Sequence, residues 1–281
     1  MSVAKNVALA VAPPLRRLVE QRDALVAQNR AATAENRAAT EQNRALAAEN
    51  RALRESAAAR EPRPDLGYLF IVTYGRSGST LLQGLLNAIP GYVIRGENAG
   101  TLEFLDAQRA AIQARLDDPR LMSAAGEVTS PWFGLDGYDT DLAAAAYRRY
   151  LLEVLLRPAD DTAVVGFKEI RWFKPADMSA FLDFVRLIFP GARFVFNTRD
   201  VDAVIRSKWW ADRDPDEARS QLAGWEDRMT AAREHLGDAA YALHYDDYVT
   251  DHASLEPFYR WLGVPFDRDA VERVFSRKHS Y

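Results

Sequence analysis

Residues 68–87 read YLFIVTYGRSGSTLLQGLLN, and this stretch decides the fold of the chain. Residues 68–73 form a short apolar, β-rich run, which predicts a strand. From Ser79 onward leucines recur at helical spacing, which predicts a helix. The stretch therefore indicates a strand, a tight turn and a helix in that order, the repeating unit of α/β domains.

The tight turn between this strand and this helix has the composition of an anion site. Gly75 and Gly78 permit close backbone approach or a positive φ. Arg76 offers a fork of donors matched to a tetrahedral oxyanion. An NTP-binding P-loop would read G-x-x-x-x-G-K-[ST], and the turn has neither that spacing nor that lysine. Three hydroxyls lie beside the free amides of the helix N-terminus, those of Ser77, Ser79 and Thr80.

Residues 75–82, GRSGSTLL, resemble the 5′-phosphosulfate loop of sulfotransferases that use 3′-phosphoadenosine 5′-phosphosulfate (PAPS). For this stretch alone, the alternative is an ordinary capped helix after a strand. The resemblance implies a fold like that of P-loop nucleotide hydrolases, PAPS as the co-substrate, and a catalytic as well as a binding role for Arg76. The donor-binding residues that it implies in this loop are Gly75, Arg76, Ser77, Gly78, Ser79, Thr80 and Leu81.

Composition and charge argue against several other classes of function. Charged residues make up 27% of the 281 and the net charge is −4, so nothing indicates general affinity for nucleic acid. The chain has no cysteine and its four histidines show no ligand spacing, so we expect no metal site. The longest apolar run near the start, residues 7–11, is too short to span a bilayer. We therefore expect a cytosolic protein without a transmembrane segment.

The first part of the chain carries a heptad pattern. Asparagine recurs every seven residues, and a leucine/alanine row keeps the same period three residues on. With the asparagines at a and the second row at d, paired buried amides favour a parallel homodimer at a cost in core stability. The alternative is a single solvated helix. The a row is Asn29, Asn36, Asn43 and Asn50, and the d row is Leu18, Leu25, Ala32, Ala39, Leu46 and Leu53.

A proline-containing segment separates this heptad extension from the rest of the chain. Residues 61–64 read EPRP, and each proline disfavours helix in the residue before it. We therefore expect a helical coiled-coil extension over residues 1–60, a linker over residues 61–65 and a separate domain over residues 66–281.

Glu97 follows the second predicted strand. Residues 92–94 are an apolar run and residues 95–97 read RGE. Strand ends and the loops after them are where sites collect in α/β sheets. The segment is similar to the one that carries the catalytic carboxylate in tyrosylprotein sulfotransferases and their bacterial relatives, which implies that Glu97 is the general base. The alternative is a carboxylate that stabilises the N-terminus of the following helix, expected over residues 99–116.

Lys168 ends another predicted strand, residues 163–169, which reads AVVGFKE. By the length of its stem alone, a lysine at this place can reach the same anion as Arg76. It resembles the lysine that touches the transferring sulfuryl group in the tyrosylprotein branch, which implies a catalytic role. The alternative is an exposed lysine paired with Glu169, and Glu169 is also the competing candidate for the base.

A second diagnostic element is the predicted strand over residues 192–198, which is followed by Arg199 and, eight residues later, by Ser207. The segment looks like the 3′-phosphate segment of sulfotransferases, where an arginine and a serine at this interval hold the 3′-phosphate of PAPS. If a helix begins at Asp200, Ser207 lies two turns into it and both residues contact one phosphate.

The last third of the chain extends the resemblance. A long polar helix is expected over residues 215–235, and residues 241–249 resemble the late strand-to-helix element that lies near the nucleotide, which implies a binding role for Tyr245. Asp246 replaces the commoner glutamate of that element. Lys278 and Ser280 resemble a terminal segment that folds over the nucleotide, and a frayed tail is the alternative.

Alternating strands and helices predict an α/β domain with a parallel sheet and helices on both faces. The resemblance covers about residues 68–281 and implies sulfuryl transfer from PAPS to an acceptor hydroxyl on a glycan, a peptide tyrosine or a small metabolite, with release of adenosine 3′,5′-bisphosphate. Two alternatives are a catalytically inactive nucleotide-binding coiled-coil adaptor and an ATP-dependent small-molecule kinase. A kinase would need Mg²⁺, and no carboxylate that would hold the metal follows a strand.

Overall fold

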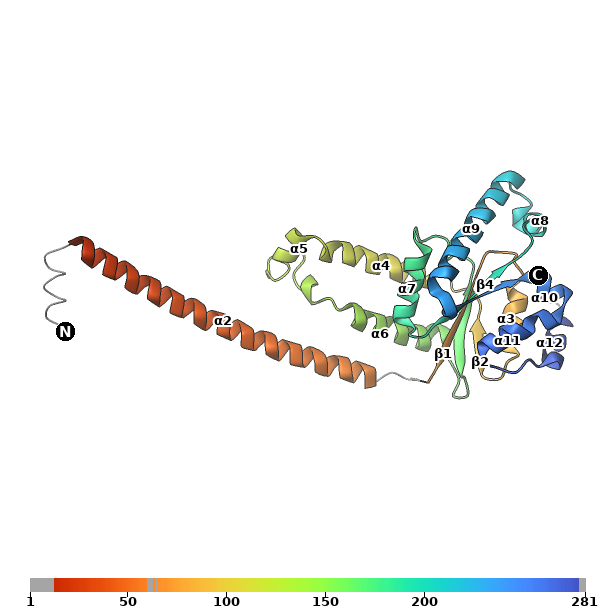
Figure 1. Ribbon diagram of the computed structural model, residues 1–281, viewed down its shortest axis with the longest axis horizontal. Coiled ribbons are helices and arrows are strands. Elements are labelled where there is room, and N and C mark those ends of the chain that lie inside the picture. Colours follow the sequence, from red (N-terminus) through yellow and green to blue (C-terminus); the bar gives the residue numbers. More distant parts are fainter. Residues whose placement is uncertain (1–12, 60–62, 64, 278–281) are drawn as a thin grey trace. The chain divides into compact units, whose positions relative to one another are not determined.

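The computed structural model describes residues 13–59, 63 and 65–277, and it divides into two compact units between Arg60 and Glu61. The first unit is one helix, α2 (Pro13–Ala59), of 47 residues (Figure 1). Three leucines of the predicted d row are exposed on it: Leu18, Leu25 and Leu46. The side chains of Asn50 and Leu53 lie outside the described residues. No helix in the described part of the chain is long and apolar enough to cross a membrane.

The second unit is built on a five-stranded sheet in the order β2-β3-β1-β4-β5. All four strand pairings are parallel, as the alternating pattern predicts. The central strand β1 lies between β3 and β4, so the turn that follows it opens beside the ends of both neighbours. The strands are β1 (Gly67–Thr73), β2 (Tyr92–Arg95), β3 (Val164–Glu169), β4 (Arg193–Thr198) and β5 (Ala240–His244).

Helices cover both faces of the sheet, because alternate residues of a strand point to opposite sides. Phe70 and Val72 join a core cluster with residues of α4, α6, α7 and α9, while Leu69 and Ile71 join a second cluster with residues of α3, α10, α11 and α12. The helices are α3 (Ser79–Asn87), α4 (Thr101–Leu116), α5 (Pro119–Ala124), α6 (Thr140–Tyr150), α7 (Met178–Ile188), α8 (Val201–Ile205), α9 (Pro215–Leu236), α10 (Tyr245–Thr250), α11 (Glu256–Leu262) and α12 (Arg268–Phe275).

Strands β1 and β3 approach each other closely at Gly166. A Cβ atom on this residue would lie 1.6 Å from the carbonyl oxygen of Leu69, so only glycine fits. The same pairing sets Lys168 opposite Ile71. Backbone pairing therefore brings the lysine to the end of β1 where the glycine-rich turn begins.

Two helices are present that the sequence patterns did not indicate. Helix α5 is a single short stretch with Asp118 as its N-cap, and α12 begins after Asp267, whose side chain accepts a hydrogen bond from the Ala270 amide. Both are too short for periodicity to stand out. Helix α6 continues directly as a π-helical segment, Leu151–Leu156.

Candidate functional site

The turn after β1 holds its amides open toward one cavity. Arg76 and Gly78 have left-handed backbone conformations, with φ of 73° and 80°, and α3 starts directly afterwards at Ser79. Ser77 is fully buried beneath the turn, where its hydroxyl lies 2.6 Å from the Thr73 hydroxyl and its carbonyl accepts a hydrogen bond from the Asn197 side chain at 2.8 Å. Ser77 thus anchors the turn from below, and its hydroxyl is already engaged there.

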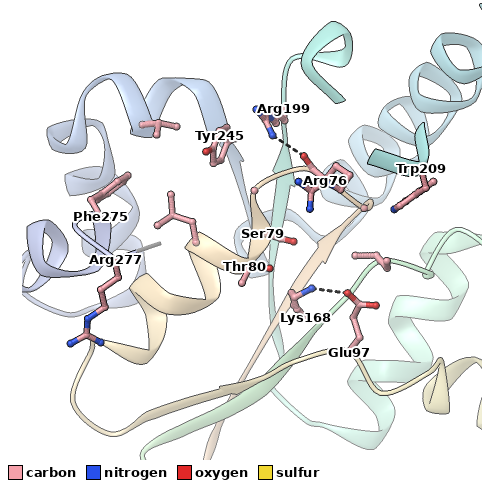
Figure 2. Close-up of a pocket in the computed structure, with 15 residues that line it drawn as sticks. Arg76, Ser79, Thr80, Glu97, Lys168, Arg199, Trp209, Tyr245, Phe275 and Arg277 are labelled. Atoms are coloured by element: carbon pink, nitrogen blue, oxygen red, sulfur yellow. Dashed lines mark hydrogen bonds and ion pairs between the residues drawn. The ribbon is translucent and has the colours of Figure 1, made fainter. Parts of the chain in front are cut away.

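The cavity has a volume of about 530 Å³ and lies over the N-terminus of α3 (Figure 2). It collects residues from segments far apart in the sequence, including most of those predicted to bind the donor. Its walls include Gly75, Arg76, Gly78, Ser79, Thr80, Leu81, Glu97, Lys168, Arg199 and Tyr245, and also five residues to which the sequence reasoning gave no role: Ile170, Trp209, Val249, Phe275 and Arg277. Among the described residues no group of metal-ligating side chains gathers.

At one end of the cavity, aromatic and cationic groups surround the turn. The Tyr245 ring packs so closely on Gly78 that a Cβ atom there would lie 1.9 Å from it. The Arg199 guanidinium lies over the same ring, 4.6 Å from its centroid, and donates to the Arg76 carbonyl at 3.1 Å. Its Nε–H is buried and has no hydrogen-bond partner among the described residues. This end therefore holds a fixed cation with a donor to spare, which suits a bound anion.

At the other end lies an ion pair between Lys168 and Glu97, with Nζ and Oε1 2.7 Å apart (Figure 2). Arg171 donates to the other carboxylate oxygen of Glu97 at 3.0 Å. Partial burial favours the neutral carboxyl, but the hydrogen bonds and charges of Lys168 and Arg171 outweigh it, so the pKa of Glu97 lies below its usual value. Lys168 is only 8% exposed, so it is not the exposed partner of Glu169 that the sequence allowed.

Glu169 has a different environment from Glu97. It is fully buried, and its carboxylate faces away from the cavity. One oxygen accepts long hydrogen bonds from the amides of Asn98 (3.4 Å) and Gly100 (3.3 Å), and the other accepts from Arg171 at 3.1 Å. Glu169 therefore holds the loop that follows Glu97, and the competing assignment of Glu169 as the base is disfavoured.

Ser207 does not lie where the helical pattern placed it. Helix α8 ends at Ile205, so Ser207 lies beyond its end in an extended conformation and not two turns into a helix. The helix stops there because the chain turns into the short 3-10 segment Lys208–Trp210, whose first residue has a φ of 48°. The Ser207 hydroxyl accepts a hydrogen bond from Nε of Arg76 at 2.9 Å. It therefore reaches the site through Arg76.

Two adjacent tryptophans form the wall above Gly75. The Trp209 indole leaves no room for a Cβ atom on Gly75, since that atom would lie 2.6 Å from it. Trp209 stacks on the buried Trp210, with ring centroids 4.6 Å apart, and the Trp210 indole N–H donates to the Gly75 carbonyl at 3.1 Å. The pair Trp209-Trp210, which follows Ser207 after one intervening lysine, was the sequence signal for this wall. Lys278 and Ser280, predicted to fold over the nucleotide, lie outside the described residues.

Comparison with known proteins agrees with this architecture. A sulfotransferase domain from an olefin synthase of Synechococcus PCC 7002 superimposes with a TM-score of 0.50 at 22% identity, over 77% of this chain and 79% of that one. The chain is also similar to a sulfotransferase domain from the curacin biosynthetic pathway (TM-score 0.49, 16% identity, 76% of this chain and 79% of that one) and to the sulfotransferase STF9 of Mycobacterium avium (TM-score 0.40, 17% identity, 79% of this chain and 71% of that one). A search of curated proteins found no match.

The fold is thus the α/β sulfotransferase fold. The model of the sulfotransferase family matches residues 69–268, which include the turn after β1, both halves of the Lys168–Glu97 pair, and Arg199. The chain therefore belongs to the sulfotransferase family and is an enzyme that transfers a sulfuryl group. This membership disfavours the adaptor and the kinase as alternatives.

Proposed function

We propose that the enzyme transfers the sulfuryl group of PAPS to an acceptor hydroxyl, with Glu97 as the general base. The acceptor oxygen forms a bond to sulfur while the bond from sulfur to the 5′-phosphate oxygen breaks. The acceptor proton passes to Glu97, and adenosine 3′,5′-bisphosphate leaves with the bond electrons. The observation that carries the proposal is that one cavity joins the turn of residues 75–80, Arg199 and the Lys168–Glu97 pair.

The residues present suit the donor. The amides at the start of α3 and the Arg76 side chain would hold the 5′-phosphosulfate, because an N-terminal helix end favours negative charge. The unpartnered Nε–H of Arg199 would contact the 3′-phosphate, with Ser207 beside it. Tyr245 and Lys168 complete the donor-facing wall. Lys168 would balance the charge that develops on the sulfuryl and leaving oxygens, a contribution of the kind made by oxyanion-stabilising groups.

The ion pair between Glu97 and Lys168 bears on how Glu97 becomes an effective base. The lysine charge is satisfied by the carboxylate 2.7 Å away. A sulfuryl group at the turn would compete for that lysine, and loss of this partner would make Glu97 a stronger base.

The overall reaction is tested by incubating the protein with cell extract and with PAPS labelled in its sulfuryl group. A labelled product together with equimolar adenosine 3′,5′-bisphosphate is expected, and bisphosphate release without any labelled acceptor would contradict the transfer.

Arg199→Ala tests the donor site. We expect adenosine 3′,5′-bisphosphate to bind roughly ten- to a hundredfold more weakly, because a charge-assisted hydrogen bond is lost. Adenosine 5′-phosphate, which lacks only the 3′-phosphate, should bind as it does to the wild type. Calorimetric titration of both nucleotides measures this, and Ser207→Ala should show a smaller change in the same direction. Equal losses for the two nucleotides would refute the 3′-phosphate assignment.

We further propose that α2 joins two copies of the chain in a parallel coiled coil. The exposed d-row leucines on this helix support the proposal, since 60% of Leu18, 60% of Leu25 and 48% of Leu46 is exposed in the single chain. Replacing all three by glutamate in the full chain should reduce the molar mass measured by light scattering from dimer to monomer. Alanines at f positions of the same helix provide the matched control: glutamate at Ala27, Ala34 and Ala48 should leave the dimer intact.

A monomeric wild-type chain would show that α2 is a solvated helix. In either case the binding of adenosine 3′,5′-bisphosphate should be unchanged by these substitutions, because α2 and the cavity belong to different compact units.

A further inference from the structure

Tyr74 is a buried tyrosine at the junction of β1 and the glycine-rich turn. Its hydroxyl oxygen lies 3.0 Å from the backbone nitrogen of Arg199, 3.0 Å from the Arg199 carbonyl oxygen and 2.5 Å from Oε1 of Glu226. None of these contacts lies in the wall of the cavity, yet two of them are with the backbone of Arg199, whose side chain does line it. The hydroxyl thus connects helix α9, which carries Glu226, to Arg199.

The direction of these hydrogen bonds follows from the single hydroxyl proton of Tyr74. Glu226 is the closest acceptor and carries a negative charge, so the proton points to it. The phenol oxygen is then free to accept the Arg199 amide N–H. Burial, followed by the hydrogen bond to Glu226, raises the pKa of Tyr74 well above its usual range, so the phenol keeps its proton at neutral pH.

Helix α9 is itself held firmly near Glu226. The neighbouring Trp225 stacks on Phe173, with ring centroids 4.6 Å apart and planes 7° from parallel. Nearer the start of the helix, the Arg219 guanidinium forms an ion pair with the carboxylate of Asp202 in α8, at 2.6 Å. The labels of Figure 1 show α8 beside one end of the long α9. Glu226 therefore projects from a helix that is held by a stacked ring beside it and by an ion pair near the start of the helix.

The backbone on either side of Arg199 is held by the pairing of β4 with β5 and by Asp246, which accepts from the Asp200 amide at 2.8 Å. Arg199 itself is held through its amide by the Tyr74 hydroxyl. Its guanidinium touches Tyr245 and the Arg76 carbonyl, but these contacts are at the far end of a flexible side chain. A small rotation of the Arg199 backbone would move the unpartnered Nε–H away from an anion. The orientation of the Arg199 backbone therefore decides where this Nε–H points.

We propose that Tyr74 and Glu226 are positioning residues that fix Arg199 for the 3′-phosphate of the donor. The inference rests on the proposed function, in which Arg199 contacts that phosphate. The two residues act through the Arg199 backbone and touch neither the donor nor the acceptor. Their removal should therefore weaken recognition of the 3′-phosphate while leaving recognition of the 5′-side unchanged.

Tyr74→Phe in the full chain tests this. We expect the dissociation constant of adenosine 3′,5′-bisphosphate to rise roughly three- to tenfold, and that of adenosine 5′-phosphate to stay within about twofold of wild type. Glu226→Gln keeps an acceptor oxygen but removes the charge, and it should give a smaller rise with the same selectivity. Tyr259→Phe is the matched control, because it removes another buried hydroxyl from a different core cluster and should change neither constant.

The ratio of the two dissociation constants is the deciding readout, since a general loss of stability would not move it selectively. An unchanged ratio in both Tyr74→Phe and Glu226→Gln, with a changed ratio in Arg199→Ala, would overturn this inference and leave the donor site standing. An unchanged ratio in Arg199→Ala would instead remove the proposed 3′-phosphate contact itself. If Tyr74→Phe lowers the melting temperature too far for titration, Glu226→Gln decides the question.

Discussion

Glu97→Gln is expected to lower kcat by about two to four orders of magnitude, because glutamine keeps the size and hydrogen bonds of glutamate but cannot take up the acceptor proton. Donor affinity should change little, since the turn after β1 and Arg199 are untouched. Turnover is measured with the acceptor identified by the labelling screen, and affinity is measured by titration with adenosine 3′,5′-bisphosphate. Near-normal turnover in this variant would show that another group removes the proton.

Glu169→Gln is the control for this prediction. Its carboxylate is fully buried and accepts from the amides of Asn98, Gly100 and Ile170 and from Arg171, so its loss should appear mainly in stability. Each kcal/mol lost lowers the melting temperature by about 2–4 °C for a domain of this size. Full activity in Glu97→Gln together with an inactive but folded Glu169→Gln would reverse the assignment of the base.

Lys168→Ala should lower kcat by about two to three orders of magnitude, because it removes the positive charge nearest to the developing oxyanions. The variant also removes one of the two cations that lower the pKa of Glu97. That pKa then rises, and since a base works only when deprotonated, the acid limb of kcat/KM should move to higher pH.

Lys168→Arg separates the two effects. The guanidinium keeps the charge beside Glu97, so the acid limb should stay near its wild-type position, while the changed shape of the head group still lowers kcat. A Lys168→Ala variant with wild-type kcat would show that the lysine only pairs with Glu97. The pH profiles of the three proteins, measured with saturating donor, give the answer.

The sequence predicted the fold well because its signals are local. Strand β1 and helix α3 follow from the apolar run and the leucine spacing of residues 68–87, and the parallel order follows from the alternation of strands and helices. The sequence placed Glu97, Lys168 and Arg199 at strand ends, which parallel pairing brings to one edge of the sheet, while the family resemblance supplied their expected roles.

The features that the sequence did not predict depend on contacts between distant segments, which the spacing of residues does not show. Arg171 follows β3 by two residues, and nothing in the sequence shows that its side chain bridges Glu97 and Glu169. The early end of α8 was missed because Ser207 and Lys208 carry no helix-breaking signal, although a tertiary contact to Arg76 holds Ser207. Such pairings become visible only when segments far apart in the chain are folded together.

The pairing of β2 with β3 has an evolutionary consequence. The chain leaves β2 at Arg95, passes through α4, α5 and α6, and returns to the strand directly beside it. This excursion begins after Glu97 and ends before Lys168, and it supplies none of the residues that line the cavity. Its exposed surface can therefore diverge among descendants of this gene while both reactive groups stay in register, as long as buried residues such as Leu102 and Leu151 keep packing on the sheet.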